Sequence, residues 1–241
     1  MKRFYAHPEQ FDEKAVTLAI EETRHLRDVL RMKLGDQAQV FDGDGREFLV
    51  EVANIGKKMT LLRVVKEIEP PAPESNLDLT LAASVYKNDK FDLVIQKAVE
   101  LGVARVSPIV TFRSETKRQA TAKRTERWRK IALEATKQCE RAKIMTVDEP
   151  VEFDAFVADV DADPGSLLMF SEKDGRGLPE QLTGKKITAL VGPKGGWEDS
   201  EIRIAEERGF IPIKLGQRIM RAETAATTFA ALLQNRFGDL N

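Results

Sequence analysis

The sequence contains little of what metal or thiol chemistry requires. Its 241 residues include one cysteine, Cys139, and two histidines, His7 and His25. A single cysteine cannot form an intrachain disulfide, and these three residues are too few for a zinc site with Cys and His ligands. The composition therefore predicts a protein without a metal, whose chemistry does not depend on a thiol relay.

Long apolar runs are also missing. The longest uninterrupted run of apolar residues has five members, at 229–233, whereas a helix needs about 20 to cross a bilayer. The N-terminal stretch at 1–14 has no apolar segment of the kind found in secretory signals. We therefore expect a cytoplasmic protein that does not interact with membranes.

The sequence has enough hydrophobic residues for a folded core, and a proline-rich segment divides it into two expected domains. Hydrophobic residues make up 42% of the chain and charged residues 32%, which is typical of a soluble globular protein. Three prolines within 70–73 cannot continue a helix or a central strand. We interpret 69–75 as a linker and expect two domains, at 1–70 and 74–241.

The first domain has the pattern of a small β-barrel. The turn sequence Asp-Gly-Asp-Gly at 42–45 predicts a hairpin between two of its strands. One helix is expected at 22–32, and His25 on it is interpreted as a packing or surface residue. The predicted strands, all rich in Val, Leu, Phe and Thr, are 2–6, 16–20, 38–41, 46–53 and 58–68.

The second domain alternates between strand and helix patterns, which is typical of an α/β fold with a mostly parallel sheet covered by helices on both faces. Strands are expected at 77–81, 104–110, 144–147, 166–171, 187–191 and 211–215. Helices are expected at 91–99, 123–142, 153–158, 199–208 and 222–236.

Three glycine-containing loops follow the last three predicted strands, at 171–177, 192–196 and 216–224. Ligands of open α/β sheets bind beyond the carboxyl ends of the strands, and glycines let backbone groups approach a ligand closely. One such loop could be an ordinary turn, but three together favour a cofactor site. The sequence lacks the GxxxxGK[ST], GxGxxG and GxSxG motifs, which disfavours nucleotide hydrolysis, dinucleotide binding and serine esterase chemistry.

Positive charge is concentrated in one segment of a chain whose net charge is −1. Residues 113–143 contain eleven Lys and Arg against four Glu, with Trp128 among them. Such a segment is typical of a surface that binds phosphates, because every phosphate contact releases counterions. A long solvated helix explains the same charges equally well.

Several longer motifs resemble one known family, along nearly the whole chain and in the same order. They are LVGPKGGWEDSEI (190–202), KLGQRIMRAETA (214–225), HLRDVLRMKLGD (25–36), QKAVELGVARVSPIVTFRSE (96–115) and KQCERA (137–142). Together they resemble the RsmE family of 16S ribosomal RNA uridine-N3 methyltransferases, which are members of the SPOUT superfamily.

The resemblance implies a fold, a reaction and partners. The fold would be an RNA-binding PUA-like β-barrel followed by an α/β SPOUT domain with a C-terminal trefoil knot. The reaction would be methylation, from S-adenosyl-L-methionine, of N3 of the uridine at position 1498 in 16S rRNA of the small ribosomal subunit. A non-enzymatic RNA-binding protein and a SPOUT methyltransferase acting on a different RNA position remain as alternatives.

The resemblance also implies a homodimer in which each pocket lies beside the partner's surface. The last predicted helix has a face that is rich in alanine and suits close helix packing. This face could equally well pack only on its own sheet. It consists of Ala222, Ala225, Ala226, Phe229, Ala230 and Leu233.

Candidate catalytic residues follow from the chemistry that the resemblance implies. As the proton leaves uracil N3, negative charge spreads onto O2 and O4, so cationic donors near these oxygens stabilise the transition state. Arg113 and Arg221 are the candidates, although each could equally be a clamp for a phosphate or a carboxylate. Lys194 stands where the family usually has an acid, and Glu198 or Glu223 could substitute for it.

Two further groups of residues are expected to bind ligands. The predicted cofactor-binding residues are Phe170, Ser171, Gly192, Gly195, Leu215, Gly216, Ile219, Met220 and Ala225. The predicted RNA-binding residues are Arg24, Arg27, Arg31, Lys123, Arg124, Gln138 and Arg141.

Overall fold

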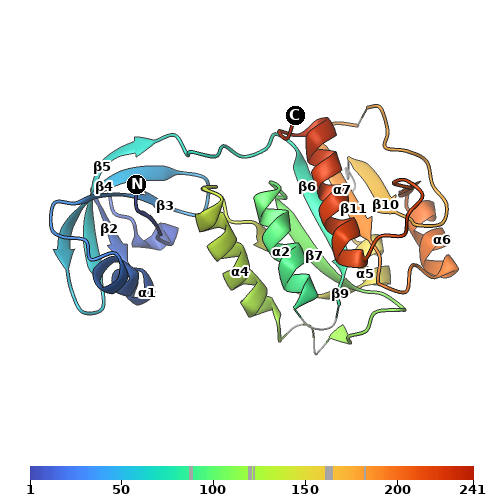
Figure 1. Ribbon diagram of the computed structural model, residues 1–241, viewed down its shortest axis with the longest axis horizontal. Helices are drawn as coiled ribbons and strands as arrows, with labels where there is room; N and C mark the ends of the chain where they lie inside the picture. Colours follow the sequence, from blue (N-terminus) through green and yellow to red (C-terminus); the bar gives the residue numbers. More distant parts are fainter. Residues whose placement is uncertain (87–88, 119–120, 122, 161–164, 182) are drawn as a thin grey trace. The chain divides into compact units, whose positions relative to one another are not determined.

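The computed structural model of the protein describes residues 1–86, 89–118, 121, 123–160, 165–181 and 183–241 (Figure 1). The chain divides into two compact units. Unit 1 consists of Met1–Glu74 and Thr136–Ile144, and unit 2 of Ser75–Ala135 and Met145–Asn241. The proline-containing segment lies between the last strand of unit 1 and the first strand of unit 2. The second stretch of unit 1, Thr136–Ile144, falls within the expected second domain, and the domain bounds 1–70 and 74–241 stay a prediction.

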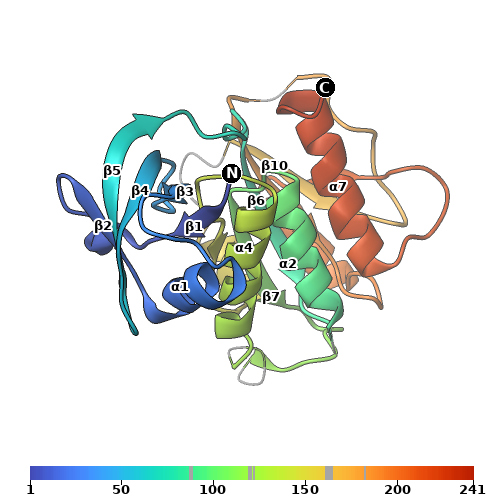
Figure 2. The same ribbon diagram turned by 60° about the vertical axis from the view of Figure 1, so that its left-hand side comes forward.

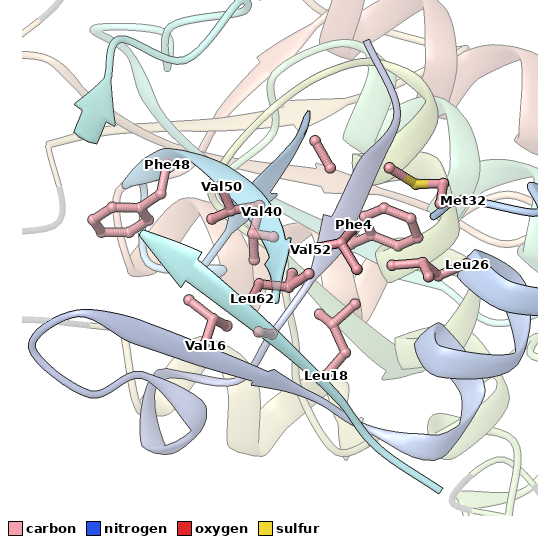
Figure 3. Close-up of a cluster of buried hydrophobic side chains, with 12 residues drawn as sticks. Phe4, Val16, Leu18, Leu26, Met32, Val40, Phe48, Val50, Val52 and Leu62 are labelled. Atoms are coloured by element: carbon pink, nitrogen blue, oxygen red, sulfur yellow. The ribbon is translucent and has the colours of Figure 1, made fainter. Parts of the chain in front are cut away.

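Unit 1 is built on a five-stranded sheet with the order β1-β3-β4-β5-β2. The strands are β1 (Arg3–Tyr5), β2 (Ala15–Leu18), β3 (Gln37–Phe41), β4 (Glu47–Ile55) and β5 (Thr60–Ile68). The predicted hairpin is confirmed, because β3 and β4 pair antiparallel across the 42–45 turn. Figure 3 shows the sheet curving around its apolar core, in which Phe4, Val40 and Leu62 are fully buried.

The helix of unit 1 differs from its predicted form. It begins as α1 (Ile20–Arg24) and continues as one turn of π-helix, His25–Val29, in which the Leu30 N–H donates to the His25 carbonyl. Arg31 follows with a φ of 51°, in the left-handed region that ends a helix. The prediction that Arg31 lies on this helix is therefore wrong, because the π-helical turn ends at Val29.

Unit 2 confirms the predicted α/β fold. Its strands are parallel, in the order β12-β10-β11-β6-β7-β8, and β9 also pairs with β7. The trefoil knot implied by the resemblance stays a prediction. The strands are β6 (Asp78–Ser84), β7 (Arg105–Val110), β8 (Thr146–Val147), β9 (Val151–Glu152), β10 (Ser166–Phe170), β11 (Lys186–Val191) and β12 (Ile211–Ile213).

Helices cover both faces of this sheet. Successive residues of β10 separate the faces: Met169 packs in the cluster that contains residues of α5 and α6, whereas the Phe170 ring lies 6.1 Å from the Phe229 ring of α7. Figures 1 and 2 show α2 and α7 side by side on one face. The helices are α2 (Lys90–Glu100), α4 (Thr125–Gln138), α5 (Phe153–Ala158), α6 (Asp199–Glu207) and α7 (Ala222–Phe237).

The alanine-rich face of α7 is buried within its own unit. Its six residues, Ala222 to Leu233, are all at most 8% exposed, and α7 contacts α2, β6 and β11. Small side chains let the helix lie close to the sheet. Of the two interpretations of this face, the structure supports packing on its own sheet, so the face no longer supports a homodimer.

Candidate functional site

A pocket opens at the carboxyl ends of β10 and β11, where the sequence predicted a ligand site. It encloses about 200 Å³ and is bordered by three loops, which follow β10, follow β11 and precede α7. Five of the predicted cofactor-binding residues line it: Phe170, Gly192, Ile219, Met220 and Ala225. Its other lining residues include Glu172, Lys194, Trp197 and Arg221.

The other four predicted cofactor-binding residues lie outside this lining. The Ser171 N–H donates to the Ile213 carbonyl, and the residue borders a second cavity beside α6. The Gly195 carbonyl accepts a hydrogen bond from Arg113. Leu215 and Gly216 belong to the loop after β12, where Gly216 has a φ of 70° that suits glycine.

Trp197 forms the floor of the pocket, and no sequence pattern indicated this role. Its indole N–H donates to the Phe170 carbonyl at 2.8 Å, and its side chain packs against Phe153. A Cβ atom at Gly192 would lie only 2.8 Å from Trp197 Cε2. Glycine at 192 is therefore required for the loop after β11 to cross the indole ring.

Three charged side chains border the apolar part of the pocket: Glu172, Lys194 and Arg221. Within the described part of the chain, none of the three forms an ion pair. The Glu172 carboxylate lies directly against Gly196, where a Cβ atom would clash with it. The pocket thus presents one negative and two positive groups that are available to a ligand.

Arg113 does not line the pocket but braces one of its loops. Its Nε donates to Glu198 Oε1 at 2.7 Å, and its Nη1 donates to the Gly195 carbonyl at 2.7 Å. This is the carboxylate clamp that the sequence left open as an alternative for Arg113. Glu198, considered as a substitute for the missing acid at 194, is the partner in that clamp.

One buried carboxylate joins the Arg113 turn to helix α6. Glu201 is 5% exposed; its Oε1 accepts from the Phe112 N–H at 2.9 Å, and its Oε2 accepts from the Glu198 N–H at 2.9 Å. The same residue is part of the capping box that begins α6. Glu201 therefore ties the turn after β7 to the loop after β11.

We expect Glu201→Gln to destabilise the protein. The amide has one acceptor oxygen and would leave one of the two partly buried N–H groups without its carboxylate partner, which costs about 1–3 kcal/mol of unfolding free energy. Denaturant unfolding of this variant and of Glu207→Gln, an exposed site on the same helix, measures the difference. Equal midpoints for the two variants would contradict the bridging role of Glu201.

Glu223 is held as a carboxylate. Burial acts to raise its pKa, but hydrogen bonds from its own backbone N–H and from Lys90, with the positive charges of Lys90 and Arg221, leave the pKa below its ordinary value. Lys90 Nζ lies 3.0 Å from Glu223 Oε1. A carboxylate stabilised in this way is a poor proton acceptor, which favours a positioning role for Glu223 over proton transfer.

The predicted RNA-binding residues fall into two groups. Arg24, Arg31, Lys123 and Gln138 have exposed side chains. The other three are engaged within the protein: Arg27 binds Asp28 and the carbonyls of residues 56 and 57, Arg124 donates to the Tyr86 carbonyl, and Arg141 is buried against Glu74. The first group is available to phosphates.

The basic segment is only partly a free surface. Trp128, which supported a phosphate-binding face, is fully buried and donates from Nε1 to Asp92 Oδ1 at 2.9 Å. Arg127 and Arg129 form ion pairs with acidic residues of neighbouring elements. Lys117, Lys123 and Lys130 stay exposed. Residues 119, 120 and 122 of this segment lie outside the described residues.

Metal ligands do not gather anywhere in the part of the chain that the structure describes. It contains no group of three or more His, Cys, Asp or Glu side chains placed to hold a metal ion. The same residues also contain no helix with the length and apolar character needed to cross a membrane.

Comparison with known proteins gives consistent similarities. Residues 73–234 match the RNA methyltransferase domain family, and residues 19–64 match the RNA methyltransferase PUA domain family. The chain is 34% identical over 237 residues to the ribosomal RNA small subunit methyltransferase E of a Synechocystis species, covering 95% of this chain and 76% of the relative. It is 29% identical to the protein of the same name from Bacillus subtilis, covering 93% of each.

A solved structure extends these similarities to the fold. The ribosomal RNA small subunit methyltransferase E of Neisseria gonorrhoeae, determined bound to S-adenosyl methionine, matches with a TM-score of 0.90 at 30% identity. The match covers 100% of both chains. The two units of this chain thus have counterparts along the whole of that structure.

Proposed function

Since the chain belongs to the ribosomal RNA small subunit methyltransferase E family, we propose that it methylates N3 of a uridine in 16S rRNA, the uridine at position 1498, using S-adenosyl-L-methionine. The observation that carries this proposal is the pocket at the carboxyl ends of β10 and β11. It combines apolar side chains with three charged ones, which suits a cofactor that has both apolar and charged parts.

The fit to the cofactor follows from its chemistry. S-adenosyl-L-methionine has an apolar adenine face, a positive sulfonium and a methionine end with both an ammonium and a carboxylate. Phe170, Val191 and Met220 supply apolar walls, and Glu172 can attract the positive groups. Lys194, which stands where the family usually has an acid, can bind a carboxylate or a phosphate.

The cofactor, when bound, supplies an activated methyl group, so the protein has to align the nucleophile and exclude water. Arg221 lines the pocket and is exposed at the N-terminus of α7. A guanidinium there can donate to O2 or O4 of uracil and stabilise the charge that develops as N3 loses its proton. Arg113 and Glu223 contribute by holding the loops and α7 in place.

Substrate binding is proposed to involve both units. The exposed cations Arg24 and Arg31 of unit 1 and Lys123 of unit 2 can contact phosphates, which position RNA without reading its sequence. We propose that the substrate is the small ribosomal subunit, that the enzyme works in the cytoplasm where ribosomes are made, and that it acts as a homodimer. The homodimer is supported by the family resemblance alone.

A direct assay tests the proposed function. Purified protein is incubated with methyl-labelled S-adenosyl-L-methionine and small subunits that lack the modification, and the labelled nucleoside is identified by mass spectrometry. We expect label on N3 of one uridine. Label on a ribose or on another base would contradict the proposal, and absence of any cofactor binding by calorimetry would favour the non-enzymatic RNA-binding alternative.

A further inference from the structure

One aromatic side chain projects into solvent beside the cofactor pocket. Phe112 is 81% exposed, and it is the only aromatic residue among the strongly exposed large hydrophobic side chains of the described residues. Exposing a phenyl ring to water is unfavourable by about 25 cal/mol per Å² of apolar surface. An exposed aromatic ring on a rigid support is therefore available to stack on a flat partner.

The support of Phe112 is a tight turn at the end of β7. The Ser114 N–H donates to the Thr111 carbonyl at 3.0 Å, which places Phe112 and Arg113 at the two corners of the turn. Beneath the turn, the hydroxyls of Ser84, Thr111 and Ser114 bond to one another at 2.9–3.2 Å. This bracing holds the backbone of Phe112 in one position.

The turn is also fixed to the cofactor pocket. Glu201 accepts from the Phe112 N–H, and Arg113 binds Glu198 and the Gly195 carbonyl. Gly195 lies between Lys194 and Gly196, which both line the pocket. The phenyl ring therefore lies on a rigid support that is attached directly to the loop after β11.

We propose that Phe112 stacks on an unpaired nucleobase of the RNA substrate and so holds the RNA beside the methyl donor. The inference rests on the proposed function and adds a substrate-positioning residue to it. Aromatic side chains bind single-stranded RNA by stacking on base faces. The residues that follow Phe112 in the chain include Arg113, Glu115 and Lys117, which are exposed and charged.

One exposed cation near the turn can serve a nucleic acid, although Glu115, between it and Phe112 in the sequence, is negative. Lys117 follows the turn with an exposed side chain, for which the described residues show no ion pair. A lysine within a few residues of a stacking ring can contact the phosphate that flanks the stacked base. The proposal therefore assigns the base to the ring and the flanking phosphate to the Lys117 ammonium.

The test compares three variants: Phe112→Ala, Phe112→Leu and Phe112→Trp. Binding is measured with a short oligouridine and with unmodified small subunits. We expect the Ala and Leu variants to lose roughly tenfold in affinity, and the Trp variant to keep or exceed the parent affinity, because stacking requires a π face. Cofactor affinity by calorimetry should be unchanged in all three, since Phe112 does not line the pocket.

The Phe112→Trp variant also supplies a spectroscopic readout. Trp128 and Trp197 are buried, at 0% and 5% exposed, so the added indole would be the solvent-exposed emitter. Stacking on a base should quench its red-shifted fluorescence when oligouridine is added. Unchanged fluorescence, or equal RNA affinity of the Ala variant and the parent, would overturn the proposal.

Two further measurements serve as controls. Sedimentation distinguishes base stacking from a dimer contact, and the methylation site of the parent protein tests the proposed activity separately. If Phe112→Ala dissociates a dimer in sedimentation and RNA binding falls only with dissociation, the ring covers a second copy of the chain and the proposal is wrong. If the parent protein methylates a different RNA position, the proposed uridine-N3 activity fails. The loss of oligouridine affinity in the Ala variant would still support the stacking role.

Discussion

Replacing Gly192 with valine should nearly eliminate cofactor binding. The Cβ of any side chain there would lie 2.8 Å from Trp197, whose ring forms the pocket floor and whose N–H binds the Phe170 carbonyl. Displacing the ring and breaking that bond each cost about 1–3 kcal/mol. We therefore expect the dissociation constant for S-adenosyl-L-methionine to rise by roughly 100-fold or more, as measured by calorimetry.

A matched glycine substitution controls for this experiment. Gly177 belongs to the loop after β10, and a Cβ atom there would meet nothing within 4 Å. Gly177→Ala should keep the parent affinity. Circular dichroism and thermal unfolding establish whether each variant is folded. A folded Gly192→Val variant with parent affinity would show that the cofactor binds elsewhere.

Removing the guanidinium of Arg221 should lower kcat by about 100- to 1000-fold, the usual effect of deleting one donor to a developing oxyanion. The side chain lines the pocket and forms no ion pair within the described residues, although its charge helps to lower the pKa of Glu223. Loss of the guanidinium should therefore lower mainly the rate of the chemical step, and cofactor affinity should change by less than about tenfold. Steady-state methylation of small subunits measures kcat, and single-turnover methylation measures the rate constant of the chemical step.

Two further variants define the role of Arg221. Arg221→Lys keeps the charge but not the planar fork, so it should recover only part of the rate if geometry matters. Arg218 is an exposed arginine of the same loop, but its side chain does not line the pocket. The Arg218→Ala variant should therefore retain nearly full activity. Equal losses in the Arg218 and Arg221 variants would indicate a general contribution of charge to RNA binding.

Gly192 and Arg221 line one pocket but act on different molecules in the proposed reaction. Gly192 and Trp197 shape the space for the cofactor, whereas Arg221 is assigned to the uracil. The network of Glu201, Arg113 and Glu198 connects the pocket loop to the Phe112 turn. Loss of Glu201 should therefore affect stability first, and activity through the position of both loops.

Sequence patterns alone predicted most of the architecture of this protein, but not that Thr136–Ile144 belongs to unit 1. The 42–45 turn, the proline-containing linker and the strand-helix alternation led to the two-part fold, because each depends on local backbone preference or on a periodicity that neighbouring residues carry. The position of the pocket also followed from sequence, because parallel strands bring their carboxyl ends, and the loops after them, to one edge of a sheet.

Side-chain partners required the tertiary structure. Trp128 and Trp197 look alike in sequence, yet the first packs against Phe91 and the second forms a pocket floor. Arg113 and Arg221 were equal candidates, and only the presence of Glu198 next to Arg113 separates a clamp from an available donor. Arg113 and Glu198 are 85 positions apart, and no local pattern encodes which distant carboxylate an arginine will meet.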